Sequence, residues 1–171
     1  MNPVHLHLML NHVPVLGSVF GLLLLGAALL RKSRELQKVS LAVCVIAAAV
    51  AIPVYFTGEP AEERIEHLPG VAKAIIEEHE EAAVVALASI LVLGAVAAAG
   101  LIVFRGQRSI PTWFVNASFI MALVTVGLML RTANLGGKVR HTEIRGDASA
   151  SRRVFEVTTR SIENENSCRI R

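Results

Sequence analysis

Charged residues are missing from four long stretches of this 171-residue chain. Three stretches, 39–57, 82–104 and 109–130, contain no charge, and a fourth, 13–30, begins directly after His12. Each is close to the roughly 20 residues with which a helix crosses about 30 Å of hydrocarbon. Proton relays and ion pathways need ionisable groups at membrane depth, so this absence argues against a self-contained pump or transporter.

Cysteines and aromatic residues are also scarce. The two cysteines, Cys44 and Cys168, lie too far apart in the sequence to indicate a disulfide framework or a metal knuckle. Aromatic residues make up 5% of a chain that is 53% hydrophobic, and Ala, Leu and Val supply most of the rest. Because these residues come in long uncharged runs, we expect their apolar surface to face lipid.

These runs predict an all-α fold, an integral membrane four-helix bundle with up-down-up-down topology. We expect the spans at about 9–30, 39–57, 80–104 and 109–131, within a transmembrane domain of residues 1–145. An acidic loop, 58–79, connects the second and third spans. The polar, aperiodic C-terminal tail, 146–171, is expected to be flexible.

Lysine and arginine predict the orientation, because they are enriched in cytoplasmic loops. The basic residues of the first and third loops are Arg31, Lys32, Arg34, Lys38, Arg105 and Arg108. The second loop is acidic, so we expect it on the outer side, together with both termini, of a bacterial plasma (inner) membrane. The net charge of +3 is thus spread over two faces and gives no reason to expect nucleic acid as a partner.

All six histidines fall on the predicted outer side. They are His5, His7, His12, His67, His79 and His141. Neutral imidazole binds metals and haem iron, and helical bundles build such sites from side chains on facing helices. We therefore examined each histidine as a ligand.

His12 and His79 are the preferred candidates, because both adjoin apolar sequence at the start of a helix that runs inward. His5 and His141 are the replacements. On a helix His5 and His12 share a face while His7 points away, so we expect His7 to be solvated. The alternative for His12 and His79 is a hydrogen bond to a neighbouring helix or to interfacial water.

Glycines allow two interpretations. Gly17 and Gly21 are four residues apart, which favours close helix packing but would also leave room for a flat cofactor. Gly136 and Gly137 predict the end of the last helix. Within the acidic loop, Pro60 marks an expected helix start, and a further helix is expected from about residue 71 into the third span.

Four segments carry a resemblance: "HLHLMLNHVPVLG", "YFTGEPAEE", "HEEAA" and "ANLGGKVRHTEIR". They resemble a group of small, largely uncharacterised bacterial four-span membrane proteins. More loosely, the chain is similar to an unknown-function family with a His-Pro start to span one and a Gly-Gly motif after span four. The similarity covers about residues 1–145, and here Asn11-His12-Val13-Pro14 stands in place of the simple His-Pro start. The resemblance implies a plasma-membrane four-helix protein that carries b-type haem near a respiratory chain.

The leading functional hypothesis is a small cytochrome b-like electron-transfer protein, or a respiratory-complex subunit, with haem b near the outer membrane face. His12 and His79 would be its axial ligands, and a quinol or a periplasmic redox partner would supply electrons. One alternative is a cofactor-free structural or assembly subunit of a larger membrane complex. Another is an outer-face site for copper, zinc or another divalent metal that uses His5, His7, His12, His79 and nearby glutamates. No nucleophile–base arrangement stands out, so we expect no independent catalytic activity.

Overall fold

The computed structural model describes residues 3–63, 73–106 and 110–140, and every secondary-structure element in these ranges is a helix. There are two short helices, α1 (Pro3–Leu10) and α4 (Gly58–Glu62). The long helices are α2 (His12–Arg31), α3 (Arg34–Phe56), α5 (Lys73–Val103) and α6 (Thr112–Arg140). The prediction of four helices that are long and apolar enough to span a membrane is confirmed.

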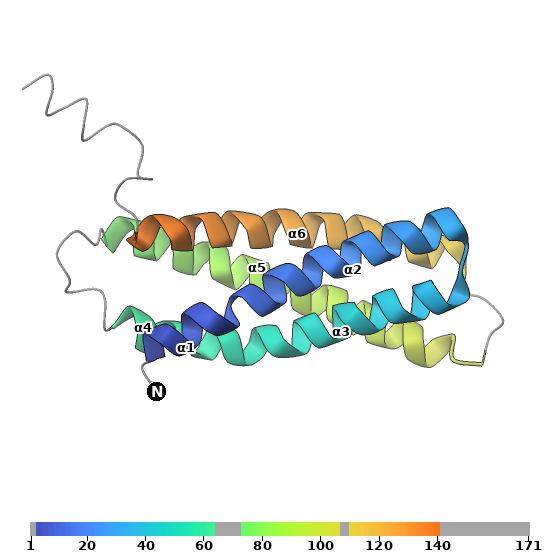
Figure 1. Ribbon diagram of the computed structural model, residues 1–171, viewed down its shortest axis with the longest axis horizontal. Helices are drawn as coiled ribbons and strands as arrows, with labels where there is room; N and C mark the ends of the chain where they lie inside the picture. The colour runs from blue at the N-terminus through green and yellow to red at the C-terminus, as the bar shows by residue number, and fades with distance from the viewer. Residues whose placement is uncertain (1–2, 64–72, 107–109, 141–171) are drawn as a thin grey trace, which may run out of the picture.

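The long helices lie alongside one another as a bundle (Figure 1). Helix α2 packs against α3 and α6, and α5 packs against the same two helices from the other side. At one end, which we call the histidine end, α1 and α4 lie at the same level as the start of α5 and the end of α6. The opposite end, which we call the basic end, contains the end of α2, the start of α3, the end of α5 and the start of α6.

Small residues let the helices approach closely, as is usual for helices in lipid. A Cβ on Gly17 would lie 3.0 Å from Cβ of Ala47, and one on Gly21 would lie 2.8 Å from Sγ of Cys44. The interpretation of Gly17 and Gly21 as room for a flat cofactor is therefore wrong, because side chains of α3 occupy that space. Gly94 of α5 packs in the same way against another residue of α3, Ala48.

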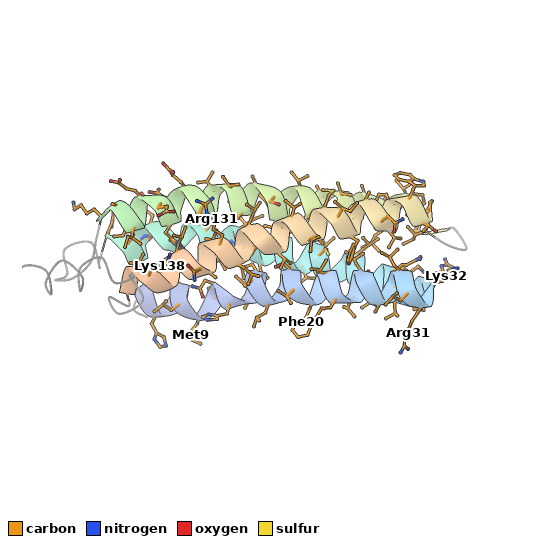
Figure 2. All side chains as sticks on the ribbon, turned by 90° about the horizontal axis from the view of Figure 1, so that it is seen from above. Met9, Phe20, Arg31, Lys32, Arg131 and Lys138 are labelled. Atoms are coloured by element: carbon orange, nitrogen blue, oxygen red, sulfur yellow. The ribbon has the colours of Figure 1, made fainter. Side chains whose placement is uncertain are left out.

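Apolar side chains cover the outside of the bundle as well as its core. Leu25, Leu41 and Leu93 are buried between the helices. Phe20 projects from the outer side of α2 (Figure 2) and is 60% exposed, and Leu30 is 87% exposed. Helices that are apolar on all sides are typical of proteins that lie in lipid.

The end of α6 differs from the prediction. The helix continues through Gly136 and Gly137 to Arg140, so the expected stop at the glycine pair is wrong. Gly136 has a packing role instead, because a Cβ there would lie only 3.1 Å from Cε1 of His79. The predicted helix starts are close to those observed, at Gly58 for α4 and at Lys73 for α5.

Candidate functional site

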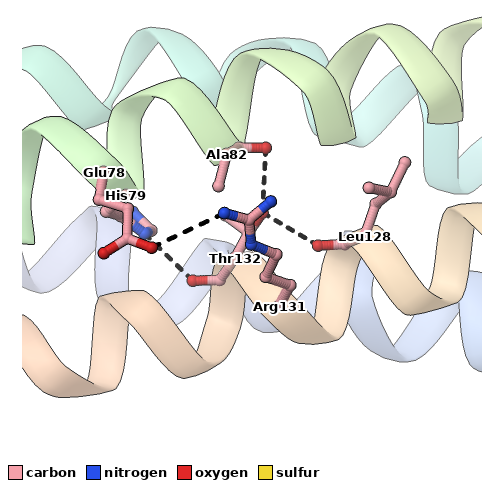
Figure 3. Close-up of polar contacts among 6 residues, drawn as sticks. All are labelled: Glu78, His79, Ala82, Leu128, Arg131 and Thr132. Atoms are coloured by element: carbon pink, nitrogen blue, oxygen red, sulfur yellow. Dashed lines mark hydrogen bonds and ion pairs between the residues drawn. The ribbon is translucent and has the colours of Figure 1, made fainter.

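His79 lies near the start of α5 and is half-buried against α6. Its Nδ1 atom is 3.1 Å from the backbone carbonyl oxygen of Thr132 (Figure 3). A carbonyl oxygen only accepts hydrogen bonds, so Nδ1–H of His79 is the donor. The neutral ring therefore carries its proton on Nδ1 and keeps a lone pair on Nε2.

Thr132 stabilises the packing around this ring. Its hydroxyl lies 3.1 Å from the carbonyl oxygen of Ala82 on α5 and 3.0 Å from that of Leu128 on α6. On the exposed side, Arg131 lies 3.7 Å from Glu78, the residue before His79 (Figure 3). The hydrogen bonds of Thr132 and the ion pair of Arg131 with Glu78 thus join the start of α5 to the end of α6 beside the His79 ring.

His7 occupies a similar environment on α1. The ring is half-buried, and its Nδ1 lies 3.0 Å from Oγ1 of Thr57, the residue between α3 and α4. The Thr57 hydroxyl donates to the carbonyl oxygen of Val54 at 2.7 Å. Because its hydrogen is already used, Oγ1 of Thr57 accepts from Nδ1–H of His7. This ring also keeps its lone pair on Nε2.

His7 on α1 and His79 near the start of α5 both lie at the histidine end of the bundle. Each ring packs beside a glycine: a Cβ on Gly58 would lie 3.6 Å from Cε1 of His7, and one on Gly136 would lie 3.1 Å from Cε1 of His79. We call His7 and His79, with their acceptors Thr57 and Thr132, the two-histidine site. An imidazole anchored through Nδ1–H with Nε2 free is the arrangement that metal-binding histidines commonly adopt.

The other predicted ligands are placed differently. His12 is exposed, and its Nδ1 donates to the carbonyl oxygen of Leu8, 2.8 Å away and one turn earlier in the chain. His5 is also exposed. His67 and His141 lie outside the described residues, as does the tail 146–171. The structure therefore places His7 and His79 at the same end of the bundle with half-buried rings, whereas His12 is exposed.

The donor set limits which groups this site could hold. Within 3–63, 73–106 and 110–140, no group of three or more His, Cys, Asp or Glu side chains is arranged to hold a metal ion. The glutamates on either side of His79, Glu78 and Glu80, are exposed. Two imidazoles are too few for a typical protein-only zinc site, but they are the number of axial ligands that haem iron takes.

The sequence does not indicate His7 as a haem ligand in preference to the other histidines. Its acceptor Thr57 is 50 residues away in the chain, and the acceptor of His79 is 53 residues away. A further polar contact between α5 and α6, from Ser89 Oγ to Thr125 Oγ1 at 2.8 Å, was also not predicted. The spacing of such residues in the sequence does not indicate that they pair, because the partners come from different helices.

Comparisons with known proteins add no information about the site. No family model, curated protein or solved structure matches the chain. A function is therefore argued from the two-histidine site and from the distribution of charge along the bundle.

Proposed function

We propose that this protein is a small, membrane-bound cytochrome b-like electron-transfer protein, or a respiratory-complex subunit, that binds haem b between His7 and His79. The observation that carries the proposal is the pair of half-buried rings, each anchored through Nδ1 with Nε2 free. Two imidazole ligands hold haem iron six-coordinate, which favours electron transfer over oxygen binding. Haem would supply a one-electron redox centre at the histidine end.

His7 takes the place of His12 in this proposal. A buried ring with a fixed orientation is a better axial ligand than an exposed one, because its orientation does not have to be established on binding. Nδ1 of His12 is also held, by the carbonyl oxygen of Leu8, but its ring is exposed like that of His5, whereas the ring held by Thr57 is half-buried. His141, which lies outside the described residues, is the remaining alternative partner for His79.

The charge on the two ends supports an orientation in the membrane. The basic end carries Arg31, Lys32, Arg34, Lys38 and Arg105, whereas α4 and the start of α5 at the histidine end are rich in glutamate. In our proposal the bundle crosses a bacterial plasma (inner) membrane in up-down-up-down order, with its basic end in the cytoplasm and both termini outside.

Aromatic residues support the same placement. Tyr55 and Phe56 lie at the histidine end, and Trp113 and Phe114 lie at the basic end, each pair in edge-to-face contact. Aromatic side chains are enriched at both membrane–water interfaces. The two-histidine site would then lie near the outer face, where it could exchange electrons with a quinol or with a periplasmic redox partner.

The test is an absorption spectrum of the full-length protein, expressed with ample haem and purified in detergent, before and after reduction with dithionite. We expect a sharp α-band on reduction and near-stoichiometric haem in a pyridine haemochrome assay. Both signals should be lost in His7→Ala and in His79→Ala. His12→Ala is the matched control and should retain them.

Circular dichroism and size-exclusion chromatography of the same samples would show that the variants remain folded. A flat spectrum from the wild-type protein would overturn the haem proposal and favour a cofactor-free structural subunit. Loss of haem in His12→Ala but not in His7→Ala would show that His12, and not His7, is the ligand.

A further inference from the structure

The basic end concentrates positive charge. Its cations are Arg31, Lys32, Arg34, Lys38 and Arg105, and Glu35 is the acid that accompanies them in the described part of this end. Arg31 and Lys32 lie at the opposite end of the bundle from Met9 and Lys138 (Figure 2).

The turn between α2 and α3 brings four of these cations together. Helix α2 ends at Arg31, and Lys32 adopts a left-handed conformation with φ of 49°. Ser33 then caps α3 by accepting a hydrogen bond from the backbone N–H of Leu36 at 3.4 Å. The positive N-terminus of α3, which favours anions, therefore lies directly beside the cations.

Arg105 reaches the same level from α5. The side chain of Leu41 lies 3.5 Å from the position of a Cβ on Gly100, which sets α3 against α5. Lys38 precedes Leu41 by about one helical turn, and Arg105 follows Gly100 by little more than one turn. The two cations are thus at similar depth.

These cations have no acidic partner within the described ranges. The ion pair between Arg131 and Glu78 is at the histidine end. Arg31, Lys32 and Arg105 are exposed, and Arg34 and Lys38 are half-buried. Five cations with a single acid nearby repel one another, so an anion from outside the chain would stabilise this end.

A phosphate-bearing headgroup offers the negative charge that these cations lack. We propose that the basic end binds the headgroup of an anionic phospholipid, such as phosphatidylglycerol. A lipid fits better than a free phosphate, because apolar side chains continue along the bundle directly from the cations. Leu30 and Val103 are exposed next to Arg31 and Arg105, and Trp113 is 68% exposed at the same end. Acyl chains can lie on these residues while the headgroup meets the basic side chains.

The proposal is tested on the full-length protein in nanodiscs of phosphatidylcholine, with and without added phosphatidylglycerol. Native mass spectrometry counts bound lipid, and thermal unfolding measures stabilisation. We expect phosphatidylglycerol to be retained and to raise the unfolding temperature. In Arg34→Gln/Lys38→Gln the lipid affinity should fall by roughly tenfold or more, since each cation near an anionic surface contributes appreciably.

Arg131→Gln, at the histidine end, is the matched control and should bind the lipid like the wild type. Arg31→Gln/Lys32→Gln changes two exposed residues and provides a second variant if the first one does not fold. Equal affinity for phosphatidylglycerol in the wild type and in a folded basic-end variant would overturn the proposal. Equal stabilisation by inorganic phosphate would also overturn it, since the ligand would then be the free anion.

Discussion

Nδ1 of His7 lies 3.0 Å from Oγ1 of Thr57, and this hydrogen bond ties the first helix of the chain to the end of α3. The Thr57 hydroxyl in turn donates to the carbonyl oxygen of Val54. The series of hydrogen bonds fixes both the direction of the His7 ring and the position of its proton. Thr57 is therefore a positioning residue for the proposed haem ligand.

Replacing Thr57 with valine keeps the shape of the side chain and removes the acceptor for His7. We expect Thr57→Val to weaken haem binding by about 10–100-fold, the usual effect of losing a partner that orients a metal-binding histidine. Titration of the haem-depleted protein with haem would measure this. Thr57→Ser retains the hydroxyl and should bind nearly as tightly as the wild type. Unchanged affinity in Thr57→Val would show that the hydrogen bond does not position a ligand.

Gly136 and Gly137 are adjacent in α6 and offer a matched pair. A Cβ on Gly136 would lie 3.1 Å from the His79 ring, whereas nothing lies within 4 Å of one on Gly137. We expect Gly136→Ala to displace the His79 ring and to shift the reduced α-band or lower the haem content. Gly137→Ala should leave the spectrum unchanged and raise stability slightly, because alanine favours helix over glycine by about 1 kcal/mol. Identical spectra for the two variants would contradict the placement of His79.

The packing of α3 against α5 depends on Gly94. A Cβ added there would overlap that of Ala48, and both residues are buried. We expect Gly94→Ala to destabilise the protein by about 1–3 kcal/mol, as overpacking of a tight core usually does. Denaturation in mixed micelles would measure the free energy of unfolding.

Two further variants would identify the cause of that loss. Ala48→Gly should restore most of the stability of Gly94→Ala, because it removes the atom that the new methyl group meets. Gly127→Ala places a methyl group where nothing lies within 4 Å and should cause no loss. Failure of Ala48→Gly to rescue would mean that the two helices do not pack at this point.

The four long helices could be predicted from the sequence, because an uncharged run of about 20 residues has few structural alternatives in lipid. Which of His7 and His12 turns inward could not be predicted from the sequence. The seven-residue spacing correctly separates the face of His5 and His12 from that of His7, but it does not show which face turns inward. In a helix that is apolar on all sides, no polar face marks the outside.

Contacts between helices show which face turns inward. Gly17 and Gly21 turn one face of α2 toward α3, and Thr57 holds His7 from a distance of 50 residues in the chain. The glycine pair near the end of α6 was misread for a similar reason. A glycine that admits a neighbouring ring has the same sequence pattern as one that ends a helix, and only the partner, His79, distinguishes the two.

The hydrogen bond between Ser89 and Thr125 allows the contribution of a buried polar pair to be measured. Oγ of Ser89 lies 2.8 Å from Oγ1 of Thr125, and Thr125 is only 1% exposed. Position 89 follows Ala82 by seven residues and position 125 precedes Thr132 by seven. The helices α5 and α6 therefore make two polar contacts in the same register: one between Thr132 and Ala82, and one between Ser89 and Thr125 two turns deeper in the bundle.

A double-mutant cycle of Ser89→Ala, Thr125→Val and the combined variant would isolate the interaction. We expect a coupling free energy of about 0.6 kcal/mol, the average for hydrogen bonds between helices in membrane proteins. The value should be modest because each hydroxyl can turn to a carbonyl of its own helix when its partner is removed. Ser118, also on α6 and buried, has no partner for its hydroxyl in the described structure, so Ser118→Ala is the control and should cause little loss. A coupling energy of zero would mean that shape, rather than hydrogen bonding, sets the register of α5 on α6.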